Sequence, residues 1–388
     1  MSNVDGARGR YCIVGAGLSG AVVGRTLAEA GHRVLVIDER KHVAGNCHTE
    51  RDTETGVMTH VYGPHIFHTG NADVWNYVQR FATMRPYRHR VRAVAGGNAY
   101  GLPINLTTIN QFFGTQFGPE EARAFVASKA VSIPQPANFE EQALSMIGPE
   151  LYHAFFRGYT RKQWGMEPTD LPASIFRRLP LRFDTNDTYY NHPWQAIPER
   201  GYTEMVAAIL NVPNLEVRLD TRFEDLAEPF AHVIYSGPID RYFRFEFGRL
   251  GYRTLDFEVI RAQGDYQGVP VINYSDQEIP YTRITEHKHF APWESETLAS
   301  TICYREFSRA CGPDDIPYYP IRLAGEESML RRYVERAQAE RGVSFIGRLG
   351  SYRYIDMDVC IAEALSAAAS ILDRIAASAP IPVFFIEP

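Results

Sequence analysis

The stretch from Tyr11 to Asn46 reads YCIVGAGLSGAVVGRTLAEAGHRVLVIDERKHVAGN. Its runs Tyr11–Val14 and Arg33–Ile37 are short and apolar, as buried parallel strands are. Between them, residues 21–30 have the pattern of a helix, and Gly31 is placed to end it. The stretch therefore predicts a strand, a helix and a second strand, the βαβ unit of a nucleotide-binding fold.

The turn between the first strand and the helix carries a glycine pattern suited to phosphate. Gly15, Gly17 and Gly20 stand in the spacing G-x-G-x-x-G. The first glycine permits the tight turn, the second lets a pyrophosphate approach the backbone, and the third lets the helix pack on the strand. Asp38 ends the second strand, where its carboxylate can accept a hydrogen bond from a ribose hydroxyl. We expect a bound dinucleotide; a plain βαβ unit with a glycine turn is the alternative.

The residues after Asp38 indicate which dinucleotide is bound. Arg40 and the run Ala44-Gly45-Asn46 continue the pattern. It resembles the longer fingerprint of FAD proteins with the glutathione-reductase-type fold, in which Ala44 replaces the first of two usual glycines. The sequence therefore favours FAD over NAD.

Length and composition describe an ordinary globular protein. The chain has 388 residues, 45% of them hydrophobic, which is enough for two or three domains. It contains no run of about 20 apolar residues, so we expect no membrane span. The net charge of −6 argues against general nucleic-acid binding. The five scattered cysteines are expected to be free thiols, and the protein is expected in the cytoplasm.

Two further patterns have competing interpretations. His65 and His68 form an H-x-x-H that two metal ligands can share, but no third ligand has convincing spacing. We therefore predict no metal, and interpret this segment as a loop beside the flavin. Four aromatic residues recur at 0, +3, +4 and +7, on one helical face: Tyr152, Phe155, Phe156 and Tyr159. Spacing alone favours a core stripe, whereas the following TRKQW, with charge and a large ring at a helix end, favours a ligand platform.

A cluster of arginines and aromatic residues lies farther along the chain. Its members are Arg177, Arg178, Arg182, Tyr189, Tyr190 and Trp194. Arginine meets phosphate oxygens with two parallel hydrogen bonds, so a site for a phosphate and a base is one interpretation. A solvated loop is the other.

The order of the predicted elements divides the chain into three interleaved domains. Residues 215–219, 232–235 and 343–346 are expected to return to the first sheet, and a final helix after Asp356 can point its dipole at an anion. Residues 257–308 alternate in several short runs, as in an antiparallel sheet. The predicted domains are FAD-binding (1–84, 199–240 and 320–388), helical (103–173) and antiparallel sheet (85–102, 174–198 and 241–319).

Eight segments carry a resemblance that spans nearly the whole chain. They are YGPHIFHT, GYTRKQWG, RRLPLRF, GYTEM, GPIDRYF, PYTRITEHKHF, PYYP and GRLGSYRYIDMD. In them the chain resembles bacterial UDP-galactopyranose mutases. The resemblance implies an α/β fold, with a FAD-binding Rossmann-like domain of the glutathione-reductase type, an inserted helical domain and an antiparallel β-sheet domain. It also implies interconversion of UDP-galactopyranose and UDP-galactofuranose by FAD that is active when reduced. A covalent bond between flavin N5 and galactose would form on the way, with no net redox change.

The resemblance also assigns residues. Arg178 and Arg283 would contact the diphosphate, and His65 would neighbour the isoalloxazine; these are the predicted catalytic residues. His89 stands where bacterial members often have an asparagine for the uridine, so that contact stays open. Further predicted substrate-binding residues are Phe155, Phe156, Tyr159, Thr160, Trp164, Tyr189, Asn273, Tyr319 and Tyr354. The predicted cofactor-binding residues are Gly15, Gly17, Leu18, Ser19, Gly20, Asp38, Glu39, Gly45, Asn46, His65, Ile66, Arg348, Tyr354, Asp356 and Met357.

Three other functions share parts of these patterns. A FAD-dependent oxidoreductase of the amine-oxidase or desaturase type would share the fold without needing two arginines in a tyrosine-rich pocket. A non-catalytic GDI-like binding protein would need no flavin, and an NAD dehydrogenase would turn over with NADH. The expected partners are the nucleotide sugar and a reductant such as NAD(P)H or a reductase, and a homo-oligomer is expected.

Overall fold

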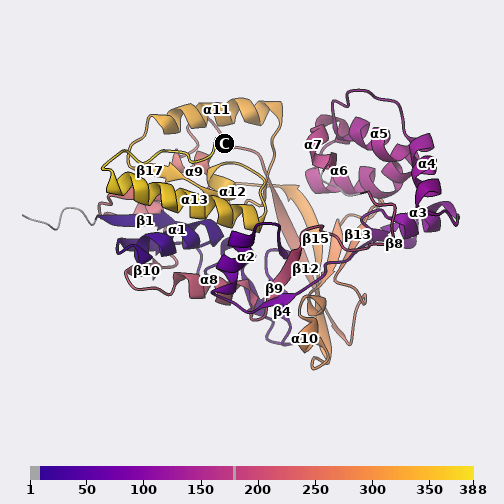
Figure 1. Cartoon of the computed structure of the whole chain (residues 1–388), viewed down its shortest axis with the longest axis horizontal. Helices are drawn as coiled ribbons and strands as arrows, with labels where there is room; N and C mark the ends of the chain where they lie inside the picture. The colour runs from indigo at the N-terminus through magenta and orange to yellow at the C-terminus, as the bar shows by residue number, and fades with distance from the viewer. Residues whose placement is uncertain (1–8, 178–180) are drawn as a thin grey trace, which may run out of the picture.

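The computed structural model describes residues 9–177 and 181–388 of the chain. Figure 1 shows three regions side by side: a sheet flanked by helices at one end, long strands in the middle, and a group of helices at the other end. The chain crosses between these regions several times, so each region is built from segments that lie far apart in the sequence.

The first region contains a five-stranded sheet in which all pairs are parallel. Its order is β10 (Leu215–Arg218), β2 (Arg33–Ile37), β1 (Arg10–Val14), β11 (His232–Tyr235) and β17 (Val343–Phe345). The helices α1 (Leu18–Glu29) and α13 (Met357–Ala376) pack against each other beside it (Figure 1). The predicted α/β fold class and the return of three late strands to the first sheet are therefore confirmed.

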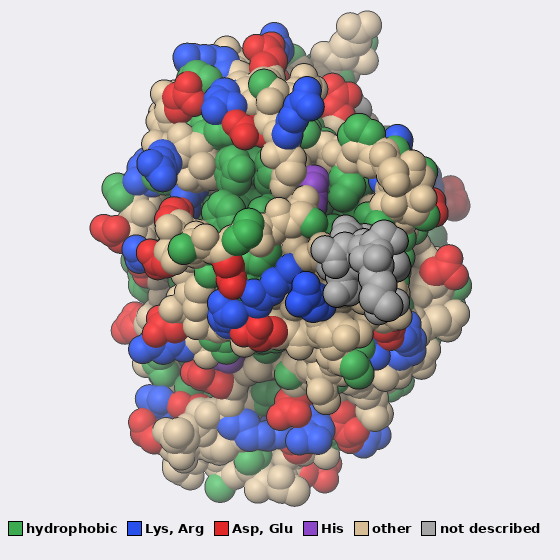
Figure 2. All heavy atoms as spheres, turned by 90° about the vertical axis from the view of Figure 1, so that its left-hand side faces the viewer, with side chains coloured by type: hydrophobic (Ala, Val, Ile, Leu, Met, Phe, Trp, Pro, Cys, Tyr) green, Lys and Arg blue, Asp and Glu red, His purple; other side chains and the backbone are tan. Residues whose placement is uncertain are grey.

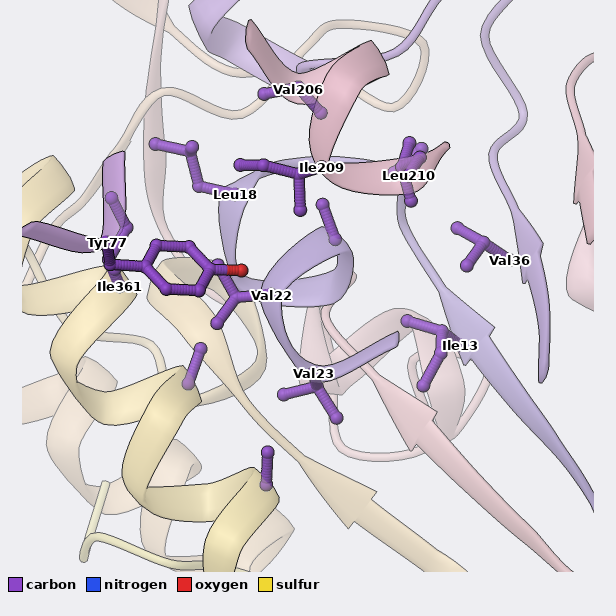
Figure 3. Close-up of a cluster of buried hydrophobic side chains, with 14 of the residues drawn as sticks. Ile13, Leu18, Val22, Val23, Val36, Tyr77, Val206, Ile209, Leu210 and Ile361 are labelled. Carbon is purple, nitrogen blue, oxygen red and sulfur yellow. The ribbon is translucent and has the colours of Figure 1, made fainter. Parts of the chain in front are cut away.

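The core of this region is assembled from both ends of the chain (Figure 3). Val22 and Val23 of α1 are fully buried and belong to one cluster with Ile361 of α13. Ile209 joins them from α8 (Gly201–Leu210). Complete burial of such a side chain contributes about 1.5–3 kcal/mol. Arg25 of α1 also donates to the carbonyl of Ile209 at 3.2 Å, which supplies a partner to the C-terminal end of α8.

A seven-stranded sheet forms the middle region. Its order is β16 (Tyr319–Pro320), β12 (Tyr252–Gln263), β15 (Ser300–Ala310), β14 (Arg283–Glu286), β13 (Val271–Tyr274), β7 (Val91–Ala95) and β8 (Asn98–Leu102). Two expectations are corrected here. The sheet is not wholly antiparallel, because β7 enters from the N-terminal half and runs parallel to β13. Of the short runs expected within 257–308, β13 and β14 are short, whereas β12 and β15 are long strands paired over their lengths.

Two small sheets connect these regions. One is the hairpin of β3 (Thr49–Arg51) and β4 (Met58–His60), and the other has the order β5 (Phe67–Thr69), β9 (Trp194–Pro198) and β6 (Met84–Pro86). The sequence predicts residues 194–198, with the rest of 174–198, in the antiparallel sheet domain. They instead pair on both sides with β5 and β6 in a separate three-stranded sheet.

The helical region holds a correction that matters for the site. Its elements are α3 (Leu106–Phe113), α4 (Pro119–Lys129), α5 (Phe139–Tyr152), the π-helical turn η3 (His153–Arg157), α6 (Gly158–Trp164), η4 (Pro168–Asp170) and α7 (Ala173–Arg177). The prediction of one aromatic face from Tyr152 to Tyr159 is wrong, because the wider π turn changes the 3.6-residue period. Tyr152 and Phe155 face the helical core, at 0% and 2% exposure.

The remaining elements are short or lie at the edges. They are α2 (Ala72–Gln79), α9 (Ile239–Tyr242), α10 (Pro292–Ser295), α11 (Ala324–Gln338), α12 (Gly347–Gly350), η2 (Gly45–Cys47), η5 (Phe223–Asp225) and η6 (His287–Phe290). Among the described helices, none is long and apolar enough to cross a membrane. All five cysteines are free thiols, as expected.

Acidic and basic side chains are intermixed over the face of the molecule shown in Figure 2. Many acidic and basic side chains of the protein form ion pairs. At the start of β1, for example, Arg10 pairs with Glu216 and with Glu228, each at 2.7 Å.

Candidate functional site

The glycine turn and the segment around Gly45 form one cradle. Gly15 has φ +105°, and its N–H donates to the Ile37 carbonyl at 2.8 Å. A Cβ on Gly45 would lie 3.3 Å from the Cα of Gly17, and one on Gly20 would lie 2.0 Å from the Gly15 carbonyl oxygen. The two turns therefore touch through their backbones, and helix α1 begins where they meet.

Helix α1 offers this cradle its N-terminus. Its N-cap is Gly17, which has no side chain to accept from the first-turn N–H groups. Leu18, Ser19 and Gly20 of that turn are buried. Unpaired N–H groups and the helix dipole both favour an anion at such a position. The geometry fits a dinucleotide pyrophosphate.

Asp38 has a structural role as well as its predicted one. Its Oδ2 accepts from the Ala16 N–H and its Oδ1 from the Arg40 N–H, each at 2.9 Å. The carboxylate thus ties the end of β2 to the glycine turn, and its ribose contact stays a prediction. Glu39 pairs with Arg241 through two bonds of 2.8 and 2.7 Å.

Arg40 and Asn46 line the same cradle. Nη2 of Arg40 donates to Oδ1 of Asn46 at 2.8 Å, and the guanidinium lies 4.8 Å from the ring centre of Tyr62. Nη1 of Arg40 is buried and has no hydrogen-bond partner within residues 9–177 and 181–388. A buried guanidinium N–H without an acceptor in the protein indicates a place where an oxygen of a phosphate or of another ligand can bind.

The C-terminal segment supplies the opposite wall. Arg348 of α12 donates through Nη2 to the Ile355 carbonyl at 2.6 Å, and its guanidinium lies 5.0 Å from the ring centre of Tyr354. Asp356 is the N-cap of the 20-residue helix α13 but makes no capping bond with its side chain. Met357 begins the helix and packs against the core of the first region. A second helix N-terminus thus faces the region of Arg348.

His65 lies between the cradle and a second group of residues. Its Nδ1 is 2.8 Å from the Gly63 carbonyl, and its backbone N–H donates to Nδ1 of His60 at 3.0 Å. Burial lowers the pKa of His65 to about 4, and the charges of Arg348 and Arg283 act in the same direction. His65 is therefore a neutral imidazole with the proton on Nδ1 and a free lone pair on Nε2. Ile66, next to it, is 5% exposed in the core.

Arg283 is the centre of the second group. It lies on β14 opposite Glu306 of β15, and its Nε donates to Oε2 of Glu306 at 2.8 Å. The glutamate is 1% exposed. Burial is the largest single effect and disfavours the charged guanidinium, but Glu306, Tyr159 and Tyr319 together outweigh it, and the pKa of Arg283 is raised well above its ordinary value.

Four predicted tyrosines gather around this arginine from four separate segments: Tyr159, Tyr189, Tyr319 and Tyr354. Burial raises the phenol pKa of Tyr159 and of Tyr319, so both hydroxyls are neutral hydrogen-bond donors. The rings of Tyr319 and Tyr354 meet edge to face, with 5.5 Å between their centres. A fixed cation among phenol groups suits the oxygens of a diphosphate.

Asn273 and His89 lie beside the same group. Asn273 of β13 is the direct cross-strand partner of Arg283, and its buried Oδ1 has no hydrogen-bond partner in the described part of the chain. Nδ1 of His89 is also buried without such a partner. Burial lowers the pKa of His89 to about 3, and Arg283 acts in the same direction. Two orphaned polar atoms beside a buried arginine indicate a place for a polar ligand.

Other predicted residues have different surroundings. Phe155 packs edge to face on Tyr100, at 5.2 Å between ring centres, and Thr160 is 4% exposed. Phe156 and Trp164 are half-buried against the helical core, with the ring of Phe156 5.1 Å from that of Phe176. Ligand contacts by these four residues stay predictions. Arg178 lies outside the described residues.

Two important residues escaped the sequence interpretation. Glu306, which holds Arg283, sits in an ordinary alternating strand and carries no motif; only its register opposite Arg283 reveals it. Arg182 belongs to the arginine and aromatic cluster of the sequence, and the resemblance assigns it no substrate contact. It is 9% exposed and donates to the Asn186 and Thr188 carbonyls and to Asn191, so it fixes the segment that carries Tyr189.

One group of three side chains could hold a metal ion among the residues the structure describes: Asp265, Glu286 and His289. The oxygens of Glu286 already accept from the backbone N–H groups of Tyr266, Gln267 and Gly268 at 2.7 to 3.0 Å. Lys288 also lies 3.2 Å from Asp265. Backbone donors and the lysine therefore neutralise these carboxylates within the protein itself. His65 and His68 do not belong to this group.

The fold and the cradle define a Rossmann-type nucleotide-binding protein, and comparison with known proteins agrees. A family model for the NAD(P)-binding Rossmann-like domain matches residues 13–81. The family model for UDP-galactopyranose mutase matches residues 154–354. The chain belongs to the UDP-galactopyranose mutase family, which is a family of enzymes.

Similar proteins cover almost the whole chain. A probable UDP-galactopyranose mutase of Klebsiella pneumoniae is 55% identical over 96% of this chain and 97% of its own length. A dTDP-fucopyranose mutase of Escherichia coli is 50% identical over 92% of this chain and 97% of its own. The crystal structure of a reduced UDP-galactopyranose mutase has the same fold, with a TM-score of 0.72 and 15% identity over 94% of this chain and 96% of that one.

Proposed function

We propose that the protein interconverts UDP-galactopyranose and UDP-galactofuranose with bound FAD in its reduced form, without net redox change. The observation that supports this best is the half-buried Arg283 among four tyrosines, next to a dinucleotide cradle with two helix N-termini. The family to which the chain belongs supports the same reaction. An oxidoreductase or a GDI-like binding protein would not need this arginine and tyrosine cluster.

The described residues have separable tasks in this reaction. Arg283 would bind the diphosphate and stabilise the negative charge that develops on UDP as the anomeric bond breaks. Tyr189, Tyr319 and Tyr354 would donate hydrogen bonds to the same group, and Tyr159 would stack on the uracil. Asn273, with its orphaned Oδ1, would accept from a hydroxyl of the substrate. Arg178 would be a second diphosphate ligand, as the resemblance implies.

The cofactor would contribute the nucleophile. Reduced FAD, when bound, would supply N5 to form a covalent bond with the sugar carbon C1, a proposal that rests on the resemblance. The side chains described around Arg283 are phenols, an amide, neutral imidazoles and the Glu306 carboxylate, which is already bonded to the arginine. His65 is neutral and lies near Arg348 and Arg283. It would accept a proton or a hydrogen bond at Nε2 beside the isoalloxazine.

A second substrate has support from one relative. Because a dTDP-fucopyranose mutase is 50% identical over 92% of this chain, a dTDP-fucose substrate is the other candidate. The two nucleotides differ in the base and in the ribose 2′-hydroxyl, and the two sugars differ at C6. The Arg283 cluster would serve either diphosphate, so substrate competition has to decide.

The test uses the reduced holoenzyme without oxygen. Dithionite-reduced protein is incubated with UDP-galactofuranose or with dTDP-fucofuranose, and the products are separated by chromatography. We expect UDP-galactopyranose from the first substrate at the higher kcat/KM, and no turnover by the oxidised protein. Turnover of neither substrate would contradict the proposal, and faster turnover of the dTDP sugar would establish the second candidate.

The covalent step has its own test. Cyanoborohydride should trap a flavin whose mass is raised by a reduced hexosyl group. Replacing FAD with 5-deaza-FAD, which has carbon at position 5, should abolish turnover while substrate binding persists. Normal turnover of the deazaflavin protein would exclude N5 as the nucleophile.

We further propose a cytoplasmic, homo-oligomeric enzyme that receives electrons from NAD(P)H or from a reductase. The free state of all five cysteines supports the reducing compartment. Anaerobic reduction of the bound flavin by NADH and by NADPH, followed by absorbance, tests the electron donor. Light scattering of the purified holoenzyme tests the assembly.

A further inference from the structure

Lys162, near the end of α6, is bound by four backbone carbonyl groups of one loop. The loop joins β13 to β14, and the acceptors are the carbonyls of Tyr274 (2.6 Å), Asp276 (2.9 Å), Ile279 (2.9 Å) and Tyr281 (3.0 Å) from Nζ. An ammonium group has three protons, so these four carbonyls occupy its full donor capacity. The lysine therefore closes the loop around its own side chain.

The strands bind the same helix end in return. Nε of Arg253 on β12 donates to the Gln163 carbonyl at 3.0 Å, and Oγ of Ser308 on β15 donates to that carbonyl at 2.7 Å. Near the start of α6, a Cβ on Gly158 would lie 2.2 Å from the Ser275 carbonyl oxygen. The helix and the sheet are therefore joined by reciprocal contacts between charged or polar groups and backbone carbonyls, with Lys162 in the centre.

Each side of this junction carries part of the proposed substrate site. Helix α6 carries Tyr159, the predicted uracil platform, three residues before Lys162. The loop held by Lys162 connects the strands that carry Asn273 and Arg283. Tyr159 marks the base subsite, and Arg283 marks the diphosphate subsite. The distance between the two is thus set by the contact between Lys162 and the loop.

We propose that Lys162 is a positioning residue that holds the uracil platform in register with the diphosphate-binding strands, and that loss of its proton uncouples the two subsites. This inference rests on the proposed function. A neutral amine has one donor fewer and directs a lone pair toward the carbonyl oxygens, so it cannot hold all four. The loop would then loosen from α6, and a ligand that spans both subsites would bind more weakly.

The electrostatic surroundings place this proton in an accessible range. Burial lowers the pKa of Lys162 to about 8, although Asp276 and Glu278 act in the opposite direction. The other titratable or charged groups on the elements packed against it are Tyr274, Tyr281, Arg161 and Arg253. Burial raises the pKa of Tyr274 to about 12, so this phenol does not titrate together with the lysine.

The experiment measures UDP affinity by calorimetry at about pH 7 and about pH 9, the two sides of the lysine titration. For the wild-type holoenzyme we expect Kd to rise by about tenfold between the two conditions. Lys162→Met should show the weak affinity at both, because it has no proton to lose. Lys162→Arg keeps its charge throughout. It should bind UDP equally at both conditions and more tightly than Lys162→Met.

Two further measurements separate positioning from folding. In turnover of UDP-galactofuranose, Lys162→Met should raise KM more than it lowers kcat, and the FAD content should be unchanged. Arg161→Met is the matched control. Arg161 is the residue before Lys162 on α6, and it bonds Gln277 of the same loop at 2.8 Å. The Arg161→Met variant should retain the alkaline change in UDP affinity. Equal UDP affinity of Lys162→Met and wild type, or an alkaline change that persists in Lys162→Arg, would overturn the inference. Wild-type protein that binds no UDP would instead refute the proposed function.

Discussion

Arg283 and Glu306 face each other on adjacent antiparallel strands, and Nε of the arginine donates to Oε2 of the glutamate at 2.8 Å. The glutamate side chain is 1% exposed, whereas that of the arginine is 20% exposed. The bond is made by Nε, which leaves the two Nη groups for other acceptors. One strand pair therefore both orients the guanidinium and supplies the charge that stabilises it when no ligand is bound.

The first prediction concerns this pair. Glu306→Gln leaves the half-buried Arg283 without its counter-charge, so the free energy of unfolding should fall by at most about 3–5 kcal/mol. Saturating UDP should recover part of this loss, because the diphosphate supplies the missing negative charge. Urea titrations with and without UDP measure both effects.

The matched control is a neighbouring cross-strand pair that shares β15 but has its partner on β12. Arg305 donates to Glu258 at 2.7 Å, but this glutamate is 55% exposed. Glu258→Gln should cost no more than about 1 kcal/mol and should show no extra rescue by UDP. Equal losses in the two variants would contradict a special role for the Arg283–Glu306 pair.

The second prediction concerns the orphaned amide of Asn273. Its Oδ1 has no acceptor role among the described residues, so Asn273→Ala should change the free energy of unfolding by less than about 0.5 kcal/mol. If this oxygen accepts from the substrate, KM should rise about 2- to 13-fold, the effect of one neutral hydrogen bond. Thermal unfolding and steady-state kinetics together measure the pattern.

Asn105→Ala should give the reverse pattern. Asn105 caps α3, and its Oδ1 accepts from the Thr108 N–H at 2.9 Å. Its loss should cost about 1 kcal/mol of stability and leave KM unchanged. A stability loss without a KM change in Asn273→Ala would show that the amide serves the fold instead.

Local sequence patterns predicted those parts of the fold whose conformation depends on residues close together in the sequence. The strands at 33–37 and 232–235 have the predicted bounds, because each is a short, mostly apolar run that polar or turn residues follow. The glycine spacing placed Gly15, Gly17 and Gly20 in the cradle: a Cβ on Gly15 or Gly20 would clash with neighbouring atoms of the protein, and the motif needs Gly17 for the approach of a pyrophosphate.

What the sequence could not predict depends on partners far along the chain. The π turn at 153–157 breaks the aromatic period, and the parallel pairing of β7 with β13 joins strands about 180 residues apart. Glu306 became visible only through its register opposite Arg283. Lys162 was noticed as part of a charged helix end, but its four carbonyl partners lie more than a hundred residues away.

The third prediction concerns acid stability. Burial lowers the pKa of His89 and of His287 to about 3, below the ordinary value of 6.5. Between these values the unfolded chain binds protons that the folded chain does not, so stability must fall as the pH is lowered through this window. Each such histidine should cost about 2 kcal/mol between pH 6.5 and pH 5. Urea unfolding at several pH values measures the slope.

A single substitution should isolate one of these protons. His287→Gln removes a titrating ring but retains an oxygen that can accept from the His60 N–H, as Nδ1 does at 3.1 Å. The slope of the unfolding free energy against pH gives the number of protons taken up on unfolding, and this number should decrease by about one. His153→Gln, at an exposed position, is the control and should leave the slope unchanged. An unaltered slope in His287→Gln would mean that this histidine is protonated in the folded protein.

The last prediction tests whether Gly17 is required for FAD binding or for folding. A Cβ on Gly17 would meet only the Cα of Gly45, at the ordinary contact distance of 3.9 Å, and the backbone of Gly17 has φ −80°. The protein alone therefore tolerates alanine there. A pyrophosphate does not, because the second glycine of the motif lets it approach the backbone. Gly17→Ala should purify as folded protein without flavin absorbance, with the unfolding midpoint of the wild-type apoprotein. Gly325→Ala, where a Cβ meets nothing within 4 Å, should keep its flavin. Stoichiometric FAD on Gly17→Ala would place the cofactor elsewhere, and an unfolded variant would mean that the turn, and not the cofactor, requires the glycine.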